Sequence, residues 1–162
     1  MGYYLKAGDV INGQQATVMV TTYDEQGNQQ TVADCFEVKN IKATVTINNI
    51  EVNTLSAPGV QHKQKGWSGS GTAECYYASS RWNEIALKYI KNAKTYTFTM
   101  VITNADVSSK IGTQSIQLKD CKISELDIAA ADVDADFLTH TLNFTFDDAD
   151  MLEEFTTPAY LA

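Results

Sequence analysis

The chain has 162 residues, of which 44% are hydrophobic, and it carries a formal net charge of −8 with a pI near 4.6. We expect one domain, residues 1–162, because a chain of this size buries roughly 70% of its unfolded surface. The acidic balance disfavours nucleic-acid binding. Without an apolar run of about 18 residues or a signal-peptide pattern at the N-terminus, we expect folding in the cytoplasm.

The N-terminal part of the sequence predicts a β-hairpin. Residues 16–22 form the first expected strand, and residues 32–38 form the return strand. Between them, residues 24–28 have the composition of a turn, in which Gly27 can take a positive φ. This part of the chain should therefore contribute two antiparallel strands.

A third strand is indicated by the alternation that starts at Ile41. Apolar residues alternate with polar ones up to Ile47, which is typical of a strand with one buried face. Asn48 and Asn49 interrupt this pattern, and residues 50–55 are expected to resume an extended conformation. The third strand is therefore expected to end near Ile47.

A polar segment, residues 56–66, follows and shows neither helical nor strand periodicity. We expect a loop here, because the segment contains Pro58 and Gly59, and a loop of this length in a compact domain is usually functional. Residues 67–71 then lead into a strand at 72–77. The small side chains just before this strand are expected to let another backbone approach closely.

One segment has a strong helical pattern, and it starts after Ser79 and Ser80, whose hydroxyl groups can cap the first N–H groups. Glu84 suits the positive end of the helix dipole, and three lysines suit the negative end. Apolar side chains recur at helical spacing and form one stripe, in which Trp82 is expected to belong to the core. The lysines are Lys88, Lys91 and Lys94, and the stripe is Trp82, Ile85, Ala86, Tyr89 and Ile90.

The C-terminal half predicts further extended segments. Residues 96–103 alternate between an apolar face and a threonine face, and residues 114–121 and 122–128 are expected to be extended. After an acidic connection, residues 137–146 alternate again. Roughly eight strands and one helix predict a mainly β fold, an antiparallel β-sandwich or barrel with one flanking α-helix.

Charge is distributed unevenly along the sequence. From Asp120 to Glu154 there are eleven acidic residues and one basic residue, Lys122, and the other eleven basic residues precede this segment. The tail, residues 147–162, is acidic and then apolar, with Phe155, Tyr160 and Leu161 near its end. Two interpretations fit the asymmetry, a solvated acidic surface and a directional assembly in which an acidic face meets a basic one.

No motif has catalytic or metal-binding spacing. The three cysteines, Cys35, Cys75 and Cys121, are isolated and are expected to be small buried side chains. Residues 132–136 lack the glycine and glutamate that a calcium loop needs, and His62 and His140 have no partner at ligand spacing. Residues 66–70 do not match the G-x-S-x-G pattern of a nucleophile elbow, and they precede a strand. We therefore assign no catalytic residue, metal or cofactor, and an enzyme is the weakest interpretation.

Several sequence blocks occur in an order that resembles the tail tube proteins of contractile tails, the family typified by the phage-like element PBSX (XkdM-like). The blocks are residues 69–77 (GSGTAECYY), the predicted helix, residues 96–100 (YTFTM), residues 124–128 (SELDI) and residues 142–148 (LNFTFDD). The resemblance covers residues 41–154, whereas residues 1–40 match poorly. It therefore rests on the order of several blocks, and no single motif carries it.

The resemblance implies a β-sandwich subunit with one flanking helix and without catalytic residues or a cofactor. Six such subunits would form a ring whose sheets join into an inner barrel, and rings would stack into the inner tube of a contractile tail. The partners would be copies of the chain itself, the sheath protein, and initiator, baseplate and terminator proteins. DNA would pass through without specific binding. Assembly would take place in the host cytoplasm, without membrane insertion, and the product would be the virion tail.

Two sets of residues are candidates for roles in such a tube. The first belongs to the polar segment and is expected to reach a neighbouring subunit or ring. It comprises Pro58, Gly59, Val60, Gln61, His62, Lys63, Gln64, Lys65 and Trp67. The second lies on two threonine faces, one or the other of which is expected to line the bore, because small uncharged side chains suit a surface past which DNA slides. It comprises Thr95, Thr97, Thr99, Thr139, Thr141, Asn143 and Thr145.

Two other interpretations stay open at this point. The same subunit would serve as the tube of a headless contractile bacteriocin, which carries no DNA. From another class, a β-sandwich that binds a small ligand or carbohydrate would use Trp67 and nearby tyrosines as its platform. That second alternative predicts a stable monomer and a saturable ligand.

Overall fold

The computed structural model describes residues 5–35 and 37–159, which form eight strands, one α-helix and two short 3-10 helices. The strands are β1 (Ala16–Tyr23), β2 (Gln29–Asp34), β3 (Val38–Val52), β4 (Gln61–Tyr76), β5 (Thr97–Ala105), β6 (Thr113–Leu126), β7 (Thr139–Phe146) and β8 (Asp148–Glu153). The helices are α1 (Arg81–Asn92), η1 (Ala7–Asp9) and η2 (Gly13–Gln15). None of the described helices has the length and apolarity needed to cross a membrane.

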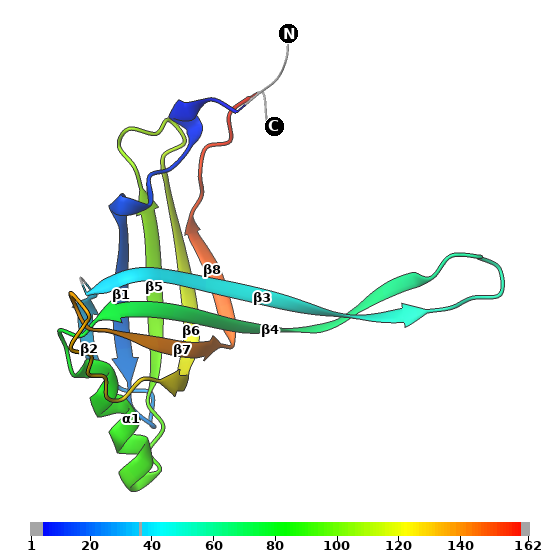
Figure 1. Cartoon of the computed structure of the whole chain (residues 1–162). Coiled ribbons are helices and arrows are strands. Elements are labelled where there is room, and N and C mark those ends of the chain that lie inside the picture. The colour runs from blue at the N-terminus through cyan, green and yellow to red at the C-terminus, as the bar shows by residue number, and fades with distance from the viewer. Residues whose placement is uncertain (1–4, 36, 160–162) are drawn as a thin grey trace.

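The strands form two crossing layers that share β6 (Figure 1). They pair antiparallel in the order β2-β1-β5-β6-β7-β4-β3, and β8 adds to β6. The first part of β6 pairs with β5, whereas Lys122–Leu126 pairs with β7. The change of layer occurs at Asp120, whose φ of 52° is positive. Strands that change sheets at such irregularities form the corners of sandwiches with crossing layers, so the predicted β-sandwich with one flanking helix is confirmed.

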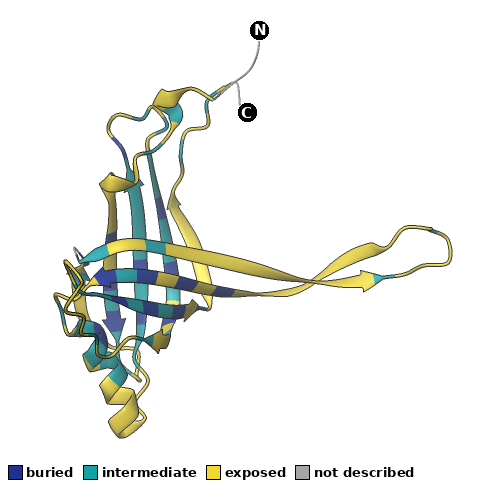
Figure 2. Cartoon of the chain, viewed as in Figure 1, coloured by how far each residue is buried: buried dark blue, intermediate teal, exposed yellow. Residues whose placement is uncertain are grey.

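The core lies between the two layers (Figure 2). Phe98 and Met100 of β5 and Leu142 and Phe144 of β7 are fully buried, so the predicted apolar faces of both strands are confirmed. Trp82 of α1 is also fully buried, and its ring centroid lies 5.3 Å from that of Phe98. This contact fixes the first turn of the helix against the sandwich and confirms that Trp82 is a core residue.

The small residues of β4 have a different role from the one that we predicted. A Cβ atom on Gly71 would lie 2.3 Å from Cζ of Phe144, and one on Gly69 would lie 2.4 Å from Cε2 of Phe146. The rings of these two phenylalanines therefore occupy the space above the glycines. The expectation that another backbone approaches here is wrong, because side chains of β7 fill the space.

Several predicted boundaries also differ. The return strand β2 is Gln29–Asp34 and ends before the predicted 32–38 segment does. Part of the acidic tail forms β8, whose Asp150 makes an ion pair with Lys119 of β6. β8 is an edge strand exposed along its whole length, so it has no burial alternation that the sequence could reveal. Two other residues singled out in the tail, Tyr160 and Leu161, lie outside the described residues.

Only one of the two serines that we predicted to cap the helix does so. Ser79 Oγ accepts a hydrogen bond from the backbone N–H of Arg81 at 3.2 Å, whereas the Ser80 side chain makes no capping bond. The far end of the apolar stripe, Tyr89 and Ile90, is exposed. The stripe is therefore covered by the sandwich only over its first turns.

Candidate functional site

A long β-hairpin projects from the body of the molecule (Figure 1). Residues 69–75 of β4 pair with both β3 and β7, but residues 61–68 pair with β3 alone. We call residues 45–68 the arm. A hairpin with no further strand or helix against it is marginally stable in water, so the arm is expected to be covered by something outside this chain.

The part of the arm nearest the body has two chemically different faces. Val45 and Ile47 of β3 and Trp67 of β4 lie on the face that continues the core, because residues directly opposite in a ladder share a face. Each of these three side chains is between 47 and 51% exposed. The Trp67 ring lies 6.2 Å from that of Phe146, at the edge of the core. This apolar patch, the proximal patch, therefore extends the core beyond its own body.

A β-bulge at Gly66 divides the arm. The ladder shifts between Ile47 and Asn49, where β4 carries one residue more than β3, and Gly66 takes a φ of 77°. The predicted break at Asn48 and Asn49 is therefore wrong, because β3 continues through it to Val52. Beyond the bulge, strand alternation places Ile50 on the face opposite to that of Ile47.

The predicted polar loop is shorter than expected. Pro58, Gly59 and Val60 lie in the turn at the tip of the arm, but the other six predicted contact residues lie on β4. Those six are Gln61, His62, Lys63, Gln64, Lys65 and Trp67. The sequence did not reveal this strand because both of its faces are exposed. It therefore lacks the alternation of apolar and polar residues that marks a half-buried strand. All nine predicted contact residues are nevertheless exposed and belong to the arm.

The two threonine faces lie on different sheets. Thr97 and Thr99 lie on β5, with Thr95 just before it, whereas Thr139, Thr141, Asn143 and Thr145 lie on β7. Their opposite partners are residues of β1 and β4, respectively. The two faces therefore belong to separate layers of the sandwich and form no common surface.

The β7 face continues across β4 and β3 as a surface of small polar side chains. Thr145 lies opposite Ser70, and Ser70 lies opposite Thr44. In the next row, Thr72 Oγ1 donates a hydrogen bond to Asn143 Oδ1 at 2.8 Å. The β3 and β4 members of this surface were absent from the predicted candidate set. The alternation of polar residues along Lys42, Thr44 and Thr46 was the signal that could have identified them.

An apolar groove of about 510 Å³ separates α1 from the end of β6. The side chains of Ile85, Tyr89 and Ile90 form its helix side, and Ile123 and Leu126 form its strand side. The β6 segment at this point, Lys122–Leu126, pairs with β7 along one edge, and no strand in the described part of the chain pairs with its other edge. The groove and this free strand edge thus lie together.

The comparisons with known proteins agree with this geometry. A family model described as phage tail tube protein matches residues 3–153. The chain belongs to the phage tail tube protein family. The resemblance found in the sequence is confirmed, and the family match also includes the N-terminal hairpin, which we had found to match poorly.

Two Bacillus subtilis (strain 168) proteins are similar to this tail tube protein over 93% of its chain and 95% of their own. The phage-like element PBSX protein XkdM is 30% identical, and the uncharacterized protein YqbM is 31% identical. Solved structures share the fold at about 10% identity. The sheath/tube terminator structure of the extracellular contractile injection system PVC has a TM-score of 0.66, with 89% of this chain and 97% of that chain covered. The tail tube of SPP1 has a TM-score of 0.59, with 94% and 83% covered.

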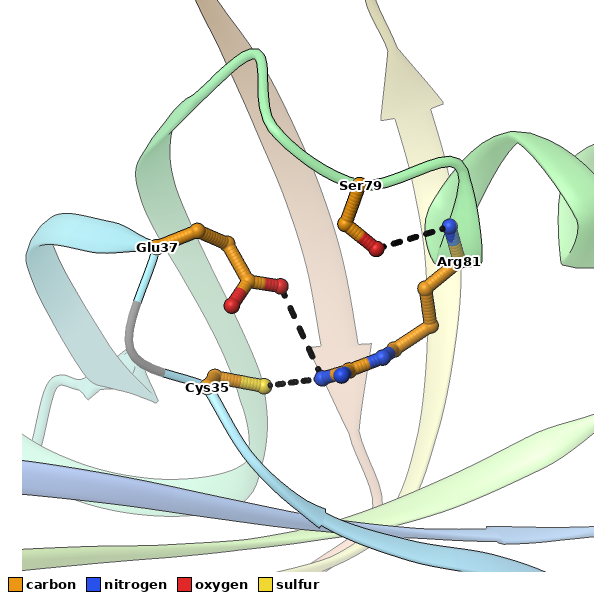
Figure 3. A network of polar contacts seen from close by, with 4 residues as sticks. All are labelled: Cys35, Glu37, Ser79 and Arg81. Carbon is orange, nitrogen blue, oxygen red and sulfur yellow. Dashed lines mark hydrogen bonds and ion pairs between the residues drawn. The ribbon is translucent and has the colours of Figure 1, made fainter.

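The one arginine of the tail tube protein joins α1 to the segment between β2 and β3 (Figure 3). Arg81 Nη1 donates a hydrogen bond to Cys35 Sγ at 2.8 Å and lies 3.6 Å from Glu37 Oε1, an ion-pair distance. Burial raises the pKa of the Cys35 thiol to about 11, although Arg81 opposes this shift. A thiol with such a pKa stays protonated at neutral pH and is a poor nucleophile.

The other two cysteines and His140 are also buried in the tail tube fold. Cys75 and Cys121 are fully buried, and burial raises the pKa of each thiol to about 12, so the prediction of small buried cysteines is confirmed. His140 of β7 is buried, its ring centroid lies 5.1 Å from that of Tyr77, and neither ring nitrogen has a hydrogen-bond partner among the described residues. Within residues 5–35 and 37–159, no three potential ligand side chains gather around a common point.

Proposed function

We propose that six copies of this tail tube protein close into a ring, and that the rings stack into the inner tube of a contractile tail. The subunit has a structural role without catalysis. Its partners in the particle are the sheath protein and the initiator, baseplate and terminator proteins. The tube conducts DNA without binding a particular sequence, and it assembles in the cytoplasm of the host.

The observation that carries this proposal is the pair of free edges on one sheet. The sheet consists of β3, β4, β7 and Lys122–Leu126, and among the described residues its two outer edges have no strand partner. Neighbouring strands are antiparallel, so with four strands the two edges run in opposite directions. Rotation about a ring axis then places β3 of one copy antiparallel to Lys122–Leu126 of the next. Closure of the ring removes both exposed edges.

The same arrangement favours one of the two threonine faces as the lining of the bore. The outer surface of this sheet, including Thr141, Asn143 and Thr145, consists mainly of small polar side chains, and its charged members include two lysines and two glutamates, Lys42, Glu74, Lys122 and Glu125. The largest cluster of charge on it is compensated, because Glu74 accepts a hydrogen bond from Asn40 Nδ2 at 2.9 Å and pairs with Lys39. DNA phosphates would find few unpaired cations there. Thr95, Thr97 and Thr99 belong to the other layer and would lie away from the bore.

Electron microscopy tests the proposal directly. The full-length protein, imaged by negative stain over a concentration series, is expected to form tubes of uniform diameter with six subunits per ring. A protein that stays monomeric at every concentration would overturn the proposal. Cryo-EM of the tubes is expected to place Thr141 and Thr145 on the bore. A bore lined by the threonine face of β5 would refute our choice of sheet.

The DNA-conducting role has a separate test. Particles purified from the producing cells are expected to carry capsids that contain DNA at one end of the tail. Headless tails in every preparation would overturn this part of the proposal and would favour the bacteriocin alternative. The ligand-binding alternative predicts a monomer with a saturable ligand, which sedimentation and calorimetry would detect.

A further inference from the structure

We infer that the groove between α1 and the end of β6 is the socket for the arm of the neighbouring copy. The proximal patch of that arm, Val45, Ile47 and Trp67, fills the groove while its β3 edge pairs with Lys122–Leu126. This inference rests on the proposed ring. It adds the specific contact through which one subunit holds the next.

The groove and the proximal patch lie on the same side of the sheet, the core side. Ile123 and Leu126 lie opposite Phe144 and Leu142, so they point to the core side of the sheet, and α1 covers them from that side. The proximal patch also points to the core side of its own sheet. When the two sheets join edge to edge, the proximal patch of one copy therefore faces α1 of the next copy.

The same chain cannot fill its own groove with its own arm. The arm leaves the body on the side away from α1 (Figure 1). Each copy thus presents an apolar insert at one end and an apolar groove at the other. A contact between two different patches, repeated around an axis, builds rings or filaments, in contrast to the self-complementary contact that stops at a dimer.

Both surfaces have apolar side chains that nothing in the described chain covers. Tyr89 is 60% exposed and Ile90 is 64% exposed, although both belong to the stripe that faces the sandwich at the start of α1. The three residues of the proximal patch are about half exposed. Contact between the two surfaces removes both from water, which is the main driving force of stable association.

Charge also favours this pairing over a contact between like surfaces. The β3–β4 hairpin carries four lysines and two glutamates, a net charge of +2. The strand side of the groove belongs to the part of the chain from Asp120 to Glu154, with eleven acidic residues and one lysine, a net charge of −10. Glu125 and that lysine, Lys122, both line the groove, and Asp127 follows on the chain. A basic arm is thus attracted to the acidic part of its neighbour and repelled by another arm.

A pair of matched charge insertions on α1 tests the socket. Ile90→Glu places a carboxylate in the groove and is expected to raise the protein concentration needed for tubes by roughly tenfold or more. The control is Leu87→Glu, because Leu87 is 43% exposed on the same helix but does not line the groove. Thermal unfolding of both monomers verifies folding. Normal assembly of Ile90→Glu, or equal impairment of both variants, would overturn the inference.

Cysteine cross-linking tests the contact itself. Oxidised tubes of the Ile47→Cys, Ile90→Cys double variant are expected to give a ladder of disulfide-linked oligomers, since the three native cysteines are buried. In the control, Ile50→Cys replaces Ile47→Cys and lies beyond the bulge on the opposite face, so no ladder is expected. Tubes that form without a ladder would overturn the socket but leave the ring intact. Failure of the unmodified protein to form tubes would instead refute the proposed function.

Discussion

The substitution Gly71→Ala is a sharp test of how the sandwich is packed. The added Cβ would lie 2.3 Å from Cζ of Phe144 and within 2.9 Å of two further ring atoms. This ring is fully buried, and its centroid lies 6.2 Å from that of Phe98, so it has little room to move. Overpacking of a core costs about 1–3 kcal/mol, and so close a contact belongs to the upper part of that range.

A gain offsets part of this cost, because alanine is favoured over glycine by about 0.5–1 kcal/mol inside a strand. We therefore expect a net loss of about 2 kcal/mol in the free energy of unfolding. For a chain of this size, the melting temperature should fall by about 4–8 °C. Urea and thermal unfolding of the monomer measure both quantities. The control is Gly59→Ala, where a Cβ meets no atom within 4 Å and stability should change by less than about 0.5 kcal/mol.

A double-mutant cycle identifies the cause of the loss. Phe144→Leu shortens the opposing side chain, so the combined variant should lose at least about 0.5 kcal/mol less than the sum of the two single variants. Additive losses would mean that the contact between residues 71 and 144 does not cause the destabilisation. A Gly71→Ala protein as stable as the unmodified one would refute the packing argument altogether.

Three further predictions concern the arm and the buried network. The double variant Lys63→Glu, Lys65→Glu should impair tube formation, because it removes the positive charge of the arm, and unchanged tubes in electron micrographs would exclude that role. Arg81→Met should lower the free energy of unfolding by about 1–3 kcal/mol, because Cys35 and Glu37 lose their shared partner, and urea unfolding without such a loss would contradict this. Burial raises the pKa of Cys35 from 9.0 to about 11, so the folded state retains the proton at higher pH than the unfolded state. Stability should therefore fall between about pH 9 and pH 11, and Cys35→Ala should reduce that slope in urea unfolding measured against pH.

The sequence predicted those parts of the fold in which one face of an element is buried. Phe98 and Met100 alternate with threonines on β5, and Leu142 and Phe144 do so on β7, because each strand has the core on one side. Trp82 was predicted to be buried for the same reason, because apolar residues recur at helical spacing along the face of α1 to which it belongs. The polar positions of the candidate bore surface were recognised on β7 for this reason, although the choice between two sheets was left open.

The classes of elements, the core faces and the family thus followed from the amino-acid sequence, because one-sided burial and the order of the blocks are visible along the chain. The folded structure was needed to show that Gln61–Gly66 belongs to an exposed arm, that rings of β7 fill the space above Gly69 and Gly71, and that the end of the α1 stripe borders an open groove. These three features depend on contacts between residues that are distant in sequence. A β-ribbon that is exposed on both faces shows no alternation of apolar and polar residues in the sequence. An apolar residue also looks the same in the sequence whether its own chain or a neighbouring copy covers it.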